Sequence, residues 1–298
     1  MLVVVGSLNV DLAVEVERFP RPGETLLASD YTLHLGGKGG NQAVAAARLG
    51  GKVRMIARVG EDHFGWQLRQ GLLHEGIDVD EVRAVGPVSG VAWIQIAPGG
   101  ENTVTVAPGA NRSLRPEDLS PELFDGARAV LAQLEIPLGT VEQALRRARE
   151  VGALRILNAA PATSLDRILD EVDLLVVNEH EAGILAGREP QTSEEALAIA
   201  SSLARKVPQA VVTLGAQGLV FAGREGEGMM AAFPVEAIDT TASGDAFVGA
   251  LAEALVEGRP FREALRWGAA AGALAATRRG AQPSLPRREA LLDLLGQL

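Results

Sequence analysis

The chain has 298 residues, of which 47% are hydrophobic, with no cysteine and a formal net charge of −10. This composition supports a folded core and excludes disulfides, thiolate metal sites and cysteine nucleophiles. The sequence has no run of basic residues that could bind nucleic-acid phosphates. No stretch approaches the roughly 18 consecutive apolar residues of a membrane span. No basic leader precedes "LVVVG". We therefore expect a cytoplasmic protein without a nucleic-acid or membrane partner.

In chain order, "LVVVG" predicts a strand, residues 10–16 alternate as a second strand, and residues 24–35 look extended. A helix of small side chains follows and stops at Gly50. Apolar strands then alternate with helices, with strands at 53–60, 129–135, 154–161, 173–179 and 209–215, and helices at 64–76, 139–152 and 193–206. This alternation predicts an α/β fold with a mainly parallel central sheet covered by helices on both faces.

One region, residues 90–111, breaks this rhythm with two extended runs joined by a Gly-Gly-Glu-Asn turn, which predicts a hairpin. With the early extended segments it predicts a small β-sheet lid built from approximately 10–35 and 88–108. From Gly244 onward the pattern is helical in three segments. No linker is long enough to separate independent units, so we expect a single domain over 1–298.

Familiar nucleotide and metal signatures are missing. Lys38 follows glycines but precedes Gly39, so no phosphate-binding P-loop is present, and no G-x-G-x-x-G opens a helix after a strand. The four histidines have no metal-ligand spacing and are interpreted as ordinary residues.

The stretch "DTTASGDAF" (239–247) predicts an anion site at the start of a helix. Three small residues, Ala242, Ser243 and Gly244, precede helical periodicity, so first-turn N–H groups are available to an anion. Asp245 then lies in that first turn, where the helix dipole stabilises a carboxylate. A weakly basic carboxylate suits phosphoryl transfer to a hydroxyl. The alternative is an ordinary helix start with an aspartate in its first turn.

A second cluster surrounds Lys38 in "LGGKGGNQ", where glycines allow close backbone approach and Asn41 follows at a helix start. These groups suit a polyol, and the alternative is a glycine-rich turn that feeds a helix. Asn9 and Asp11 follow the first strand, and Glu135 ends another, where open α/β sheets place ligands. Such polar residues at strand ends are also common turn formers.

Together these segments resemble the ribokinase-like family of carbohydrate kinases. "GGKGGNQAVAAARLG" and "DTTASGDAFVGAL" resemble its two signature regions. The similarity runs the whole length in the same order, through "GSLNVD", "FPRPGET", "APGAN", "QLEIP", "VVNEHEA", "VVTLGAQG" and "ATRRGAQPSLP".

The resemblance implies ATP-dependent phosphorylation of D-ribose at its 5-hydroxyl. Asp245 matches the family's base, and Ala242, Ser243 and Gly244 match its anion hole. The positions matching sugar ligands are Asn9, Asp11, Gly37, Lys38, Asn41 and Glu135, together with Asp245. Those matching the nucleotide site are Asn178, Thr213, Gly215, Gly218 and Gly244. The family also implies a homodimer formed through the lid sheet, which closes over the sugar.

The resemblance further implies Mg²⁺ near Glu181 and a monovalent cation, expected to be K⁺. The positions matching the monovalent site are Asp239, Thr241, Ala275, Arg278, Gly280 and Ser284. The anion hole reads Ala-Ser-Gly where relatives more often have Gly-Ala-Gly or Ala-Ala-Gly, and a position often polar beside adenine is Ala269. Two alternatives stay open: a kinase for another furanose or a nucleoside, and a catalytically silent sugar- or nucleotide-binding regulator.

Overall fold

The computed structural model describes residues 1–28, 30–98, 101–163, 165 and 168–296. Its main sheet has the strand order β13-β12-β11-β10-β9-β8-β1-β4-β5. Neighbours from β11 to β5 pair in parallel, whereas β12 and β13 are antiparallel. The strands are β1 (Leu2–Val5), β4 (Val53–Val59), β5 (Asp78–Ala84), β8 (Ala129–Gln133), β9 (Leu154–Asn158), β10 (Leu174–Asn178), β11 (Gln209–Thr213), β12 (Leu219–Gly223) and β13 (Gly228–Met230). The predicted, mainly parallel sheet is confirmed.

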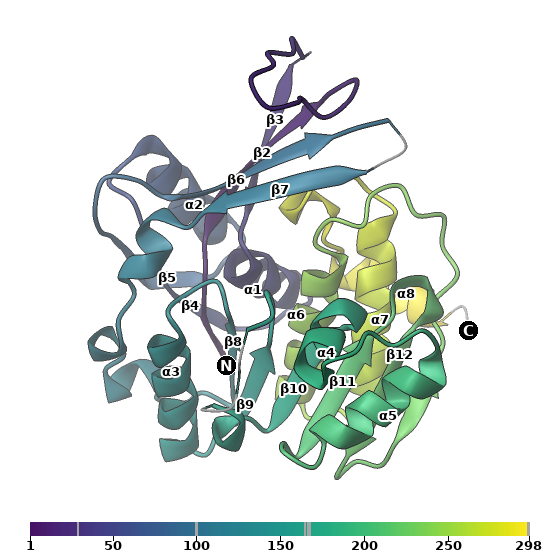
Figure 1. The fold of residues 1–298 in the computed structure, drawn as a ribbon. Coiled ribbons are helices and arrows are strands. Elements are labelled where there is room, and N and C mark those ends of the chain that lie inside the picture. The colour runs from purple at the N-terminus through teal and green to yellow at the C-terminus, as the bar shows by residue number, and fades with distance from the viewer. Residues whose placement is uncertain (29, 99–100, 164, 166–167, 297–298) are drawn as a thin grey trace.

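Helices cover both faces of this sheet (Figure 1). In β1, Leu2 and Val4 enter one apolar core while Val3 and Val5 enter the other, because successive side chains of a strand point to opposite faces. The first core contains residues of α1 (Lys38–Arg48), α2 (His63–His74), α6 (Ser243–Glu257), α7 (Phe261–Ala276) and α8 (Arg288–Gly296). The second contains residues of α3 (Leu138–Glu150), α4 (Glu179–Ala186) and α5 (Ser193–Leu203). Short 3-10 turns lie at Gly109–Ser113, Pro116–Asp118, Pro121–Phe124, Leu169–Glu171, Gly215–Gln217 and Gln282–Ser284.

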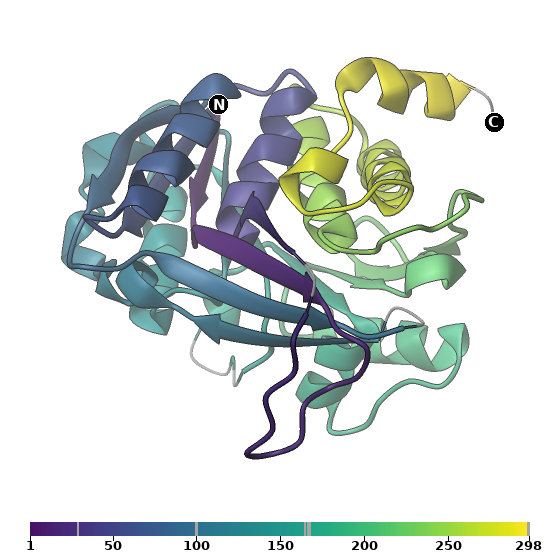
Figure 2. The ribbon, with the colours of Figure 1, turned by 90° about the horizontal axis from the view of Figure 1, so that it is seen from above.

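A separate four-stranded sheet stands off the main body (Figures 1 and 2). Its order is β3-β2-β6-β7, with β2 (Asn9–Glu15), β3 (Tyr31–Gly36), β6 (Gly90–Ile96) and β7 (Asn102–Ala107). Strands β6 and β7 pair antiparallel, which confirms the predicted hairpin, although turn residues 99–100 lie outside the described part. Of the residues expected to be extended, 24–28 belong to no strand, and β3 begins only at Tyr31. Tyr31 pairs with Val14, and β2 ends one residue later, so among the described residues no strand lies opposite 24–28.

The three helices predicted from Gly244 onward are confirmed as α6, α7 and α8. Helix α1 packs closely against α6 at Gly249. A Cβ placed on Gly249 would come within 2.5 Å of the Gln42 carbonyl oxygen, so only a residue without a side chain fits there. This close approach brings the N-terminal ends of α1 and α6 together beneath the small sheet. None of the described helices has the length and apolar character needed to cross a lipid bilayer.

Candidate active site

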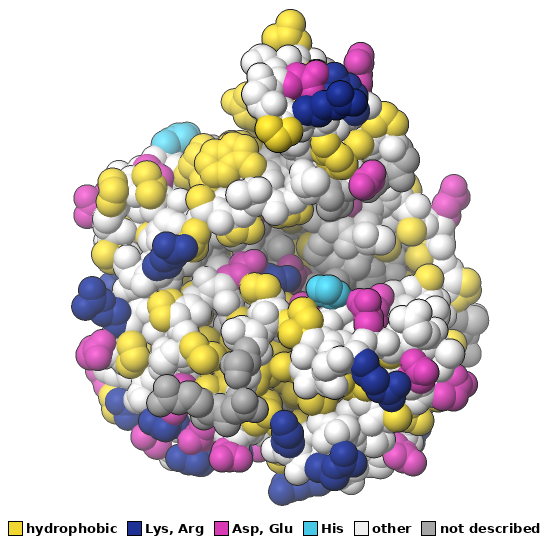
Figure 3. Space-filling view, viewed as in Figure 1, with side chains coloured by type: hydrophobic (Ala, Val, Ile, Leu, Met, Phe, Trp, Pro, Cys, Tyr) yellow, Lys and Arg dark blue, Asp and Glu magenta, His cyan; other side chains and the backbone are white. Residues whose placement is uncertain are grey.

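A pocket of about 230 Å³ opens at the carboxyl edge of the main sheet. Asn158, Asn178 and Thr213 line it from the last positions of β9, β10 and β11, which is where open α/β sheets place ligands. Figure 3 shows the hollow between the small sheet and the main body, with acidic and basic side chains together inside it. The full lining is Lys38, Asn158, Ala160, Val176, Val177, Asn178, Glu181, Thr213, Thr240, Ala242, Gly244, Asp245 and Val248.

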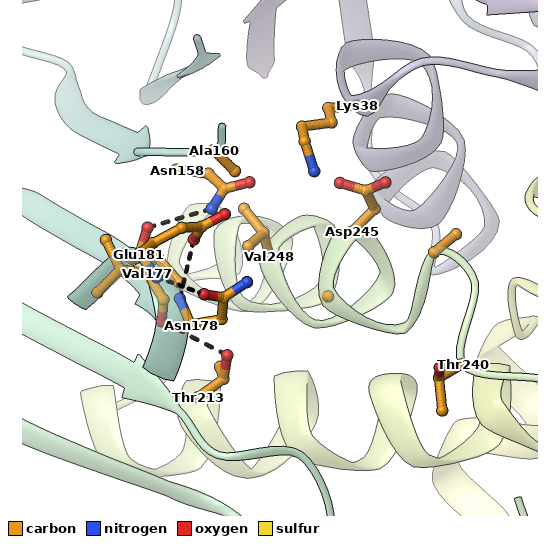
Figure 4. Close-up of a pocket in the computed structure, with 13 residues that line it drawn as sticks. Lys38, Asn158, Ala160, Val177, Asn178, Glu181, Thr213, Thr240, Asp245 and Val248 are labelled. Carbon is orange, nitrogen blue, oxygen red and sulfur yellow. Dashed lines mark hydrogen bonds between the residues drawn. The ribbon is translucent and has the colours of Figure 1, made fainter. Parts of the chain in front are cut away.

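Asp245 is the acid at the centre of this arrangement. Its side chain is buried in the first turn of α6, as the sequence predicts, yet it borders the pocket and points toward Lys38 (Figure 4). Asn41 Nδ2 donates to its Oδ2 at 2.9 Å, and Gln42 Nε2 donates to its Oδ1 at 2.9 Å. Two consecutive residues of α1 therefore hold a carboxylate that lies more than 200 residues away in sequence.

The turn before Asp245 has an unusual backbone. Ala242 has φ 58°, a left-handed conformation found in no other non-glycine residue within the described ranges. The Ser243 N–H donates to the Thr240 carbonyl at 3.1 Å, and the Ser243 Oγ is buried without a partner among the described residues. Gly244 borders the pocket, and a Cβ placed on it would meet no atom within 4 Å. The first-turn amides of Gly244 and Asp245 thus remain the helix donors nearest to the pocket.

The residues predicted to bind sugar come together around Glu135. Its Oε2 accepts from Ser7 Oγ, from Asn9 Nδ2 at 3.4 Å and from the Lys38 N–H at 3.2 Å. Gly37 has φ 83°, and a Cβ there would lie 2.6 Å from the Asn9 nitrogen. Only glycine fits this close, left-handed position.

Asn41 and Asp11 supply further acceptors near Glu135. Asn41 Oδ1 is buried and has no partner in the described part of the chain, so it is available to a hydroxyl donor. The pKa of Asp11 is raised to about 7, mainly by burial and then by the charges of Glu135 and Asp245. The positive charge of Lys38 acts in the opposite direction but does not offset these effects. This cluster is dominated by acceptors and suits a ligand rich in hydroxyl groups.

Lys38 is the cation facing these acids. Burial, the largest single influence, lowers its pKa, but the surrounding carboxylates of Asp245, Glu135, Glu181 and Asp11 together outweigh burial, and the pKa of Lys38 is raised. Lys38 therefore stays charged, and its amine is directed toward the pocket beside Asp245 (Figure 4).

Asn178 and Thr213 are directly opposite each other on β10 and β11 and both line the pocket. Asn178 caps α4: its Oδ1 accepts from the Glu181 N–H at 2.8 Å, and Glu181 Oε2 accepts from the Asn178 N–H at 2.9 Å. Burial raises the pKa of Glu181. Gly215 and Gly218 lie in the β11–β12 turn with φ of 55° and 95°, outside the residues that line the pocket.

The six positions predicted for a monovalent cation lie around the end of α7. Asp239 Oδ1 accepts from the Thr241 N–H and hydroxyl, and its Oδ2 accepts from the Gly280 N–H at 2.8 Å. Burial would raise the pKa of Asp239, but these hydrogen bonds outweigh burial and lower it. The Arg278 N–H donates to the Ala275 carbonyl, and Ser284 Oγ donates to the Ala281 carbonyl. The result is an ionised Asp239 carboxylate held by donors from Thr241 and Gly280.

Sequence reasoning missed five polar residues of this site, which are Ser7, Gln42, Asn111, Gln133 and Asn158. All five are buried. Gln133 and Asn158 each end an apolar strand, which is the same signal that identified Glu135. Gln42 stands in an alanine- and valine-rich helix, where a polar residue facing the core needs a partner.

Comparison with known proteins identifies the family. The model of the pfkB family carbohydrate kinases matches residues 1–288. The chain belongs to this family. It is 42% identical over 300 residues to the ribokinase of Haemophilus influenzae, covering 99% of this chain and 98% of that protein. It is 36% identical over 303 residues to the deoxyribokinase of Salmonella typhimurium, covering 99% and 98% of the two chains.

A solved structure supports the same conclusion. The structure of Arabidopsis thaliana ribokinase complexed with ribose and ATP matches with a TM-score of 0.91 and 35% identity, over 99% of this chain and 98% of that one. The predicted family and the ribokinase-like α/β fold are therefore confirmed.

Proposed function

We propose that this protein transfers the γ-phosphoryl group of ATP to the 5-hydroxyl of D-ribose, giving D-ribose 5-phosphate and ADP. One observation carries the proposal: the buried Asp245 carboxylate borders the same pocket as the α6 amides and Lys38. A hydroxyl acceptor and a terminal phosphate can meet only where a base and anion-binding donors converge. Similarity to ribokinases over nearly the whole chain supports ribose as the sugar.

In this reaction the ribose hydroxyl oxygen forms a bond to the γ-phosphorus while the bond from that phosphorus to the bridging oxygen of ADP breaks. Asp245 accepts the hydroxyl proton as that bond forms. The amides of Gly244 and Asp245, which have no acceptor in the described part of the chain, lie at the N-terminus of α6, where they stabilise negative charge on the transferred group. Ser243 shapes this turn rather than supplying a donor, since its amide is already bonded to Thr240, whereas Ala242 borders the pocket.

The sugar would be held by the acceptor-rich cluster. Asp11, Glu135 and the free Asn41 oxygen accept from sugar hydroxyls. Asn9, Gly37 and Lys38 complete the predicted sugar site; in the structure Asn9 and the Lys38 amide both donate to Glu135. ATP would lie toward Asn178, Thr213, Gly215 and Gly218.

Mg²⁺ and a monovalent cation belong to this proposal. Glu181 leaves Oε1 for a cation or its water shell, which fits Mg²⁺ because it is usually held by one or two carboxylates, waters and phosphate oxygens. The ionised Asp239 and nearby carbonyls fit K⁺. Both cations would offset phosphate charge. No cluster of three or more histidine, aspartate or glutamate ligands occurs among the described residues, so neither site is a cage of such side chains.

The small sheet is proposed as a lid and as a dimer contact. Strand register places Asp11 and Asn9 on its site-facing side, and Tyr31 and Trp93 on the other side with exposed fractions of 69% and 51%. A second copy would cover these aromatic side chains. Light scattering that finds only monomer at working concentration would overturn this part of the proposal. We also place the enzyme in the cytoplasm, where its co-substrate ATP is available.

The function is tested by measuring ADP release with a panel of D-ribose, 2-deoxyribose, fructose and inosine, each with Mg²⁺ and with or without K⁺. We expect ribose to have the highest kcat/KM. Because the chain resembles a deoxyribokinase, 2-deoxyribose is the second candidate. A tenfold preference for another sugar, about 1.4 kcal/mol in transition-state binding, would overturn the ribose assignment. Ribose binding without ADP release from any acceptor would instead support the silent regulator.

A further inference from the structure

Gln42 occupies an unusual position next to the proposed base. It is fully buried in the first half of α1, and its Nε2 donates to Asp245 Oδ1 at 2.9 Å. Gln42 is absent from the pocket lining, whereas Asp245 is part of it. A side chain in this position affects an incoming substrate through the pocket residues that it bonds, and of these Asp245 is the one proposed to meet the reacting hydroxyl.

Neighbouring amides fix the orientation of the Gln42 side chain. Asn158 Nδ2 donates to the Val176 carbonyl at 3.1 Å, so Asn158 Oδ1 is turned toward Gln42 and accepts from its Nε2 at 2.9 Å. On the other side, Gln133 Nε2 donates to Gln42 Oε1 at 2.6 Å. A flipped Gln42 would place its oxygen against two acceptors and its NH₂ group against a donor. The network therefore specifies one arrangement, in which N–H faces Asp245.

Helix packing brings Gln42 within reach of Asp245. Gly249 and Asp245 lie one turn apart on α6, and a Cβ on Gly249 would collide with the Gln42 carbonyl at 2.5 Å and with Ala45 Cβ at 2.7 Å. This absence of a side chain lets α1 approach α6 closely enough for an amide side chain to bridge them.

We propose that Gln42 is a positioning residue for Asp245, locked in place by Gln133 and Asn158. Its N–H keeps the carboxylate in the orientation that accepts the substrate proton and stabilises the ionised form by a charge-assisted hydrogen bond. Asn41 provides the second donor, but its Oδ1, which has no partner among the described residues, also belongs to the proposed sugar site, whereas Gln42 has no atom in the pocket lining. This inference rests on the proposed phosphoryl transfer.

The test is Gln42→Met, which keeps the length of the side chain and removes its donor. We expect kcat to fall about 10- to 100-fold, the loss of one charge-assisted hydrogen bond at the reacting group. KM for the sugar should stay within about threefold, and the acid limb of the pH–kcat profile should move to higher pH. The matched control is Gln209→Met: Gln209 is also buried, but it bonds the Glu225 N–H away from the pocket. This control should leave both kcat and its pH profile as in the wild type.

Two further measurements distinguish a positioning role of Gln42 from an effect of its substitution on folding. In an Asp245→Asn background, Gln42→Met should lower residual kcat less than about twofold, because the group through which it acts is gone. If Gln42→Met does not fold, Gln133→Met decides, since it removes the donor to Gln42 Oε1 without touching Asp245; kcat should fall about 3- to 10-fold.

Wild-type kcat and pH profile in both single variants would overturn the positioning role, as would a full additional loss in the Asp245→Asn background. Wild-type enzyme assayed in parallel distinguishes the two proposals. If it phosphorylates no sugar, the proposed function fails, whereas an active wild type with unaffected variants refutes only the role of Gln42.

Discussion

Two buried carboxylates on α6 show what burial alone does and does not do. Asp245 and Glu253 lie eight residues apart, about two turns, on the side of the helix that faces α1, with exposed fractions of 7% and 4%. Asp245 receives two amide donors and borders the pocket. Glu253 Oε2 has no partner within the described residues and lies against Gly51, where a Cβ would come within 2.4 Å.

The chemistry of the two sites differs accordingly. Burial, followed by the charge of Glu257, raises the pKa of Glu253 to about 7. The charged groups that act in the other direction are the N-terminal amine, Arg288 and Arg128. Hydrogen-bond donors and access to a pocket, rather than depth, distinguish a carboxylate prepared for chemistry from one that is simply enclosed.

The largest effect is expected from Asp245→Asn, which tests whether Asp245, unlike Glu253, takes part in the reaction. We expect kcat to fall about 10²- to 10⁴-fold, because the proton acceptor is lost, while the Kd for the sugar changes little. Steady-state kinetics and calorimetric sugar titration measure the two effects. A kcat like that of the wild type would remove Asp245 from the mechanism.

Asp11 sharpens the comparison because it shares the site of Asp245 but has no side-chain hydrogen bond among the described residues. Its pKa is raised to about 7, so it is largely protonated at pH 6 and ionised at pH 8. If the ionised form binds the sugar, the apparent Kd should fall about tenfold over that interval as pH rises. Titrations of Asp11→Asn are the comparison: an equal pH dependence in this variant would assign the effect to another group.

Glu253→Gln tests the opposite member of the pair. A carboxyl whose pKa is raised on folding stabilises the folded state most at low pH, and this contribution is lost as pH rises from about 4.5 to 7. At pH 8 the variant should therefore be more stable than the wild type. We expect a difference of about 1–2 kcal/mol.

Denaturant unfolding at pH 5 and pH 8 measures this effect. ADP release by Glu253→Gln should match that of the wild type, since the group lies two turns from the pocket. A large loss of turnover would contradict the view that only the Asp245 end of α6 takes part in the reaction.

The smallest effect expected is that of Ala242→Gly on stability. Ala242 has φ 58°, which costs an alanine about 1 kcal/mol relative to glycine. Thermal unfolding should show a gain of about that size. A loss of stability would mean that the turn before Asp245 needs a side chain at this position.

Much of the site was visible as local pattern. "ASGD" before a helical run predicted Asp245 in the first turn of α6, and a polar residue at a strand end predicted Glu135 near the carboxyl edge, whereas Asn178 came from the family resemblance alone. Gln42 escaped, although it follows Asn41 directly, because its importance lies in partners separated from it by 91, 116 and 203 residues. Gly215 and Gly218 show the reverse case: their turn is evident from the residues, but it lies beside the pocket lining rather than in it.

By itself the sequence determined the order of strands and helices, the two-faced central sheet and the helix start that holds Asp245. These features depend on periodicity and turn chemistry over a few residues, which neighbouring side chains encode directly. Only the tertiary structure decided which donors reach that carboxylate, that the Ser243 amide bonds Thr240, and that Glu253 Oε2 has no partner among the described residues. Such contacts join distant segments, and they depend on how closely α1 packs against Gly249, a distance that no local pattern specifies.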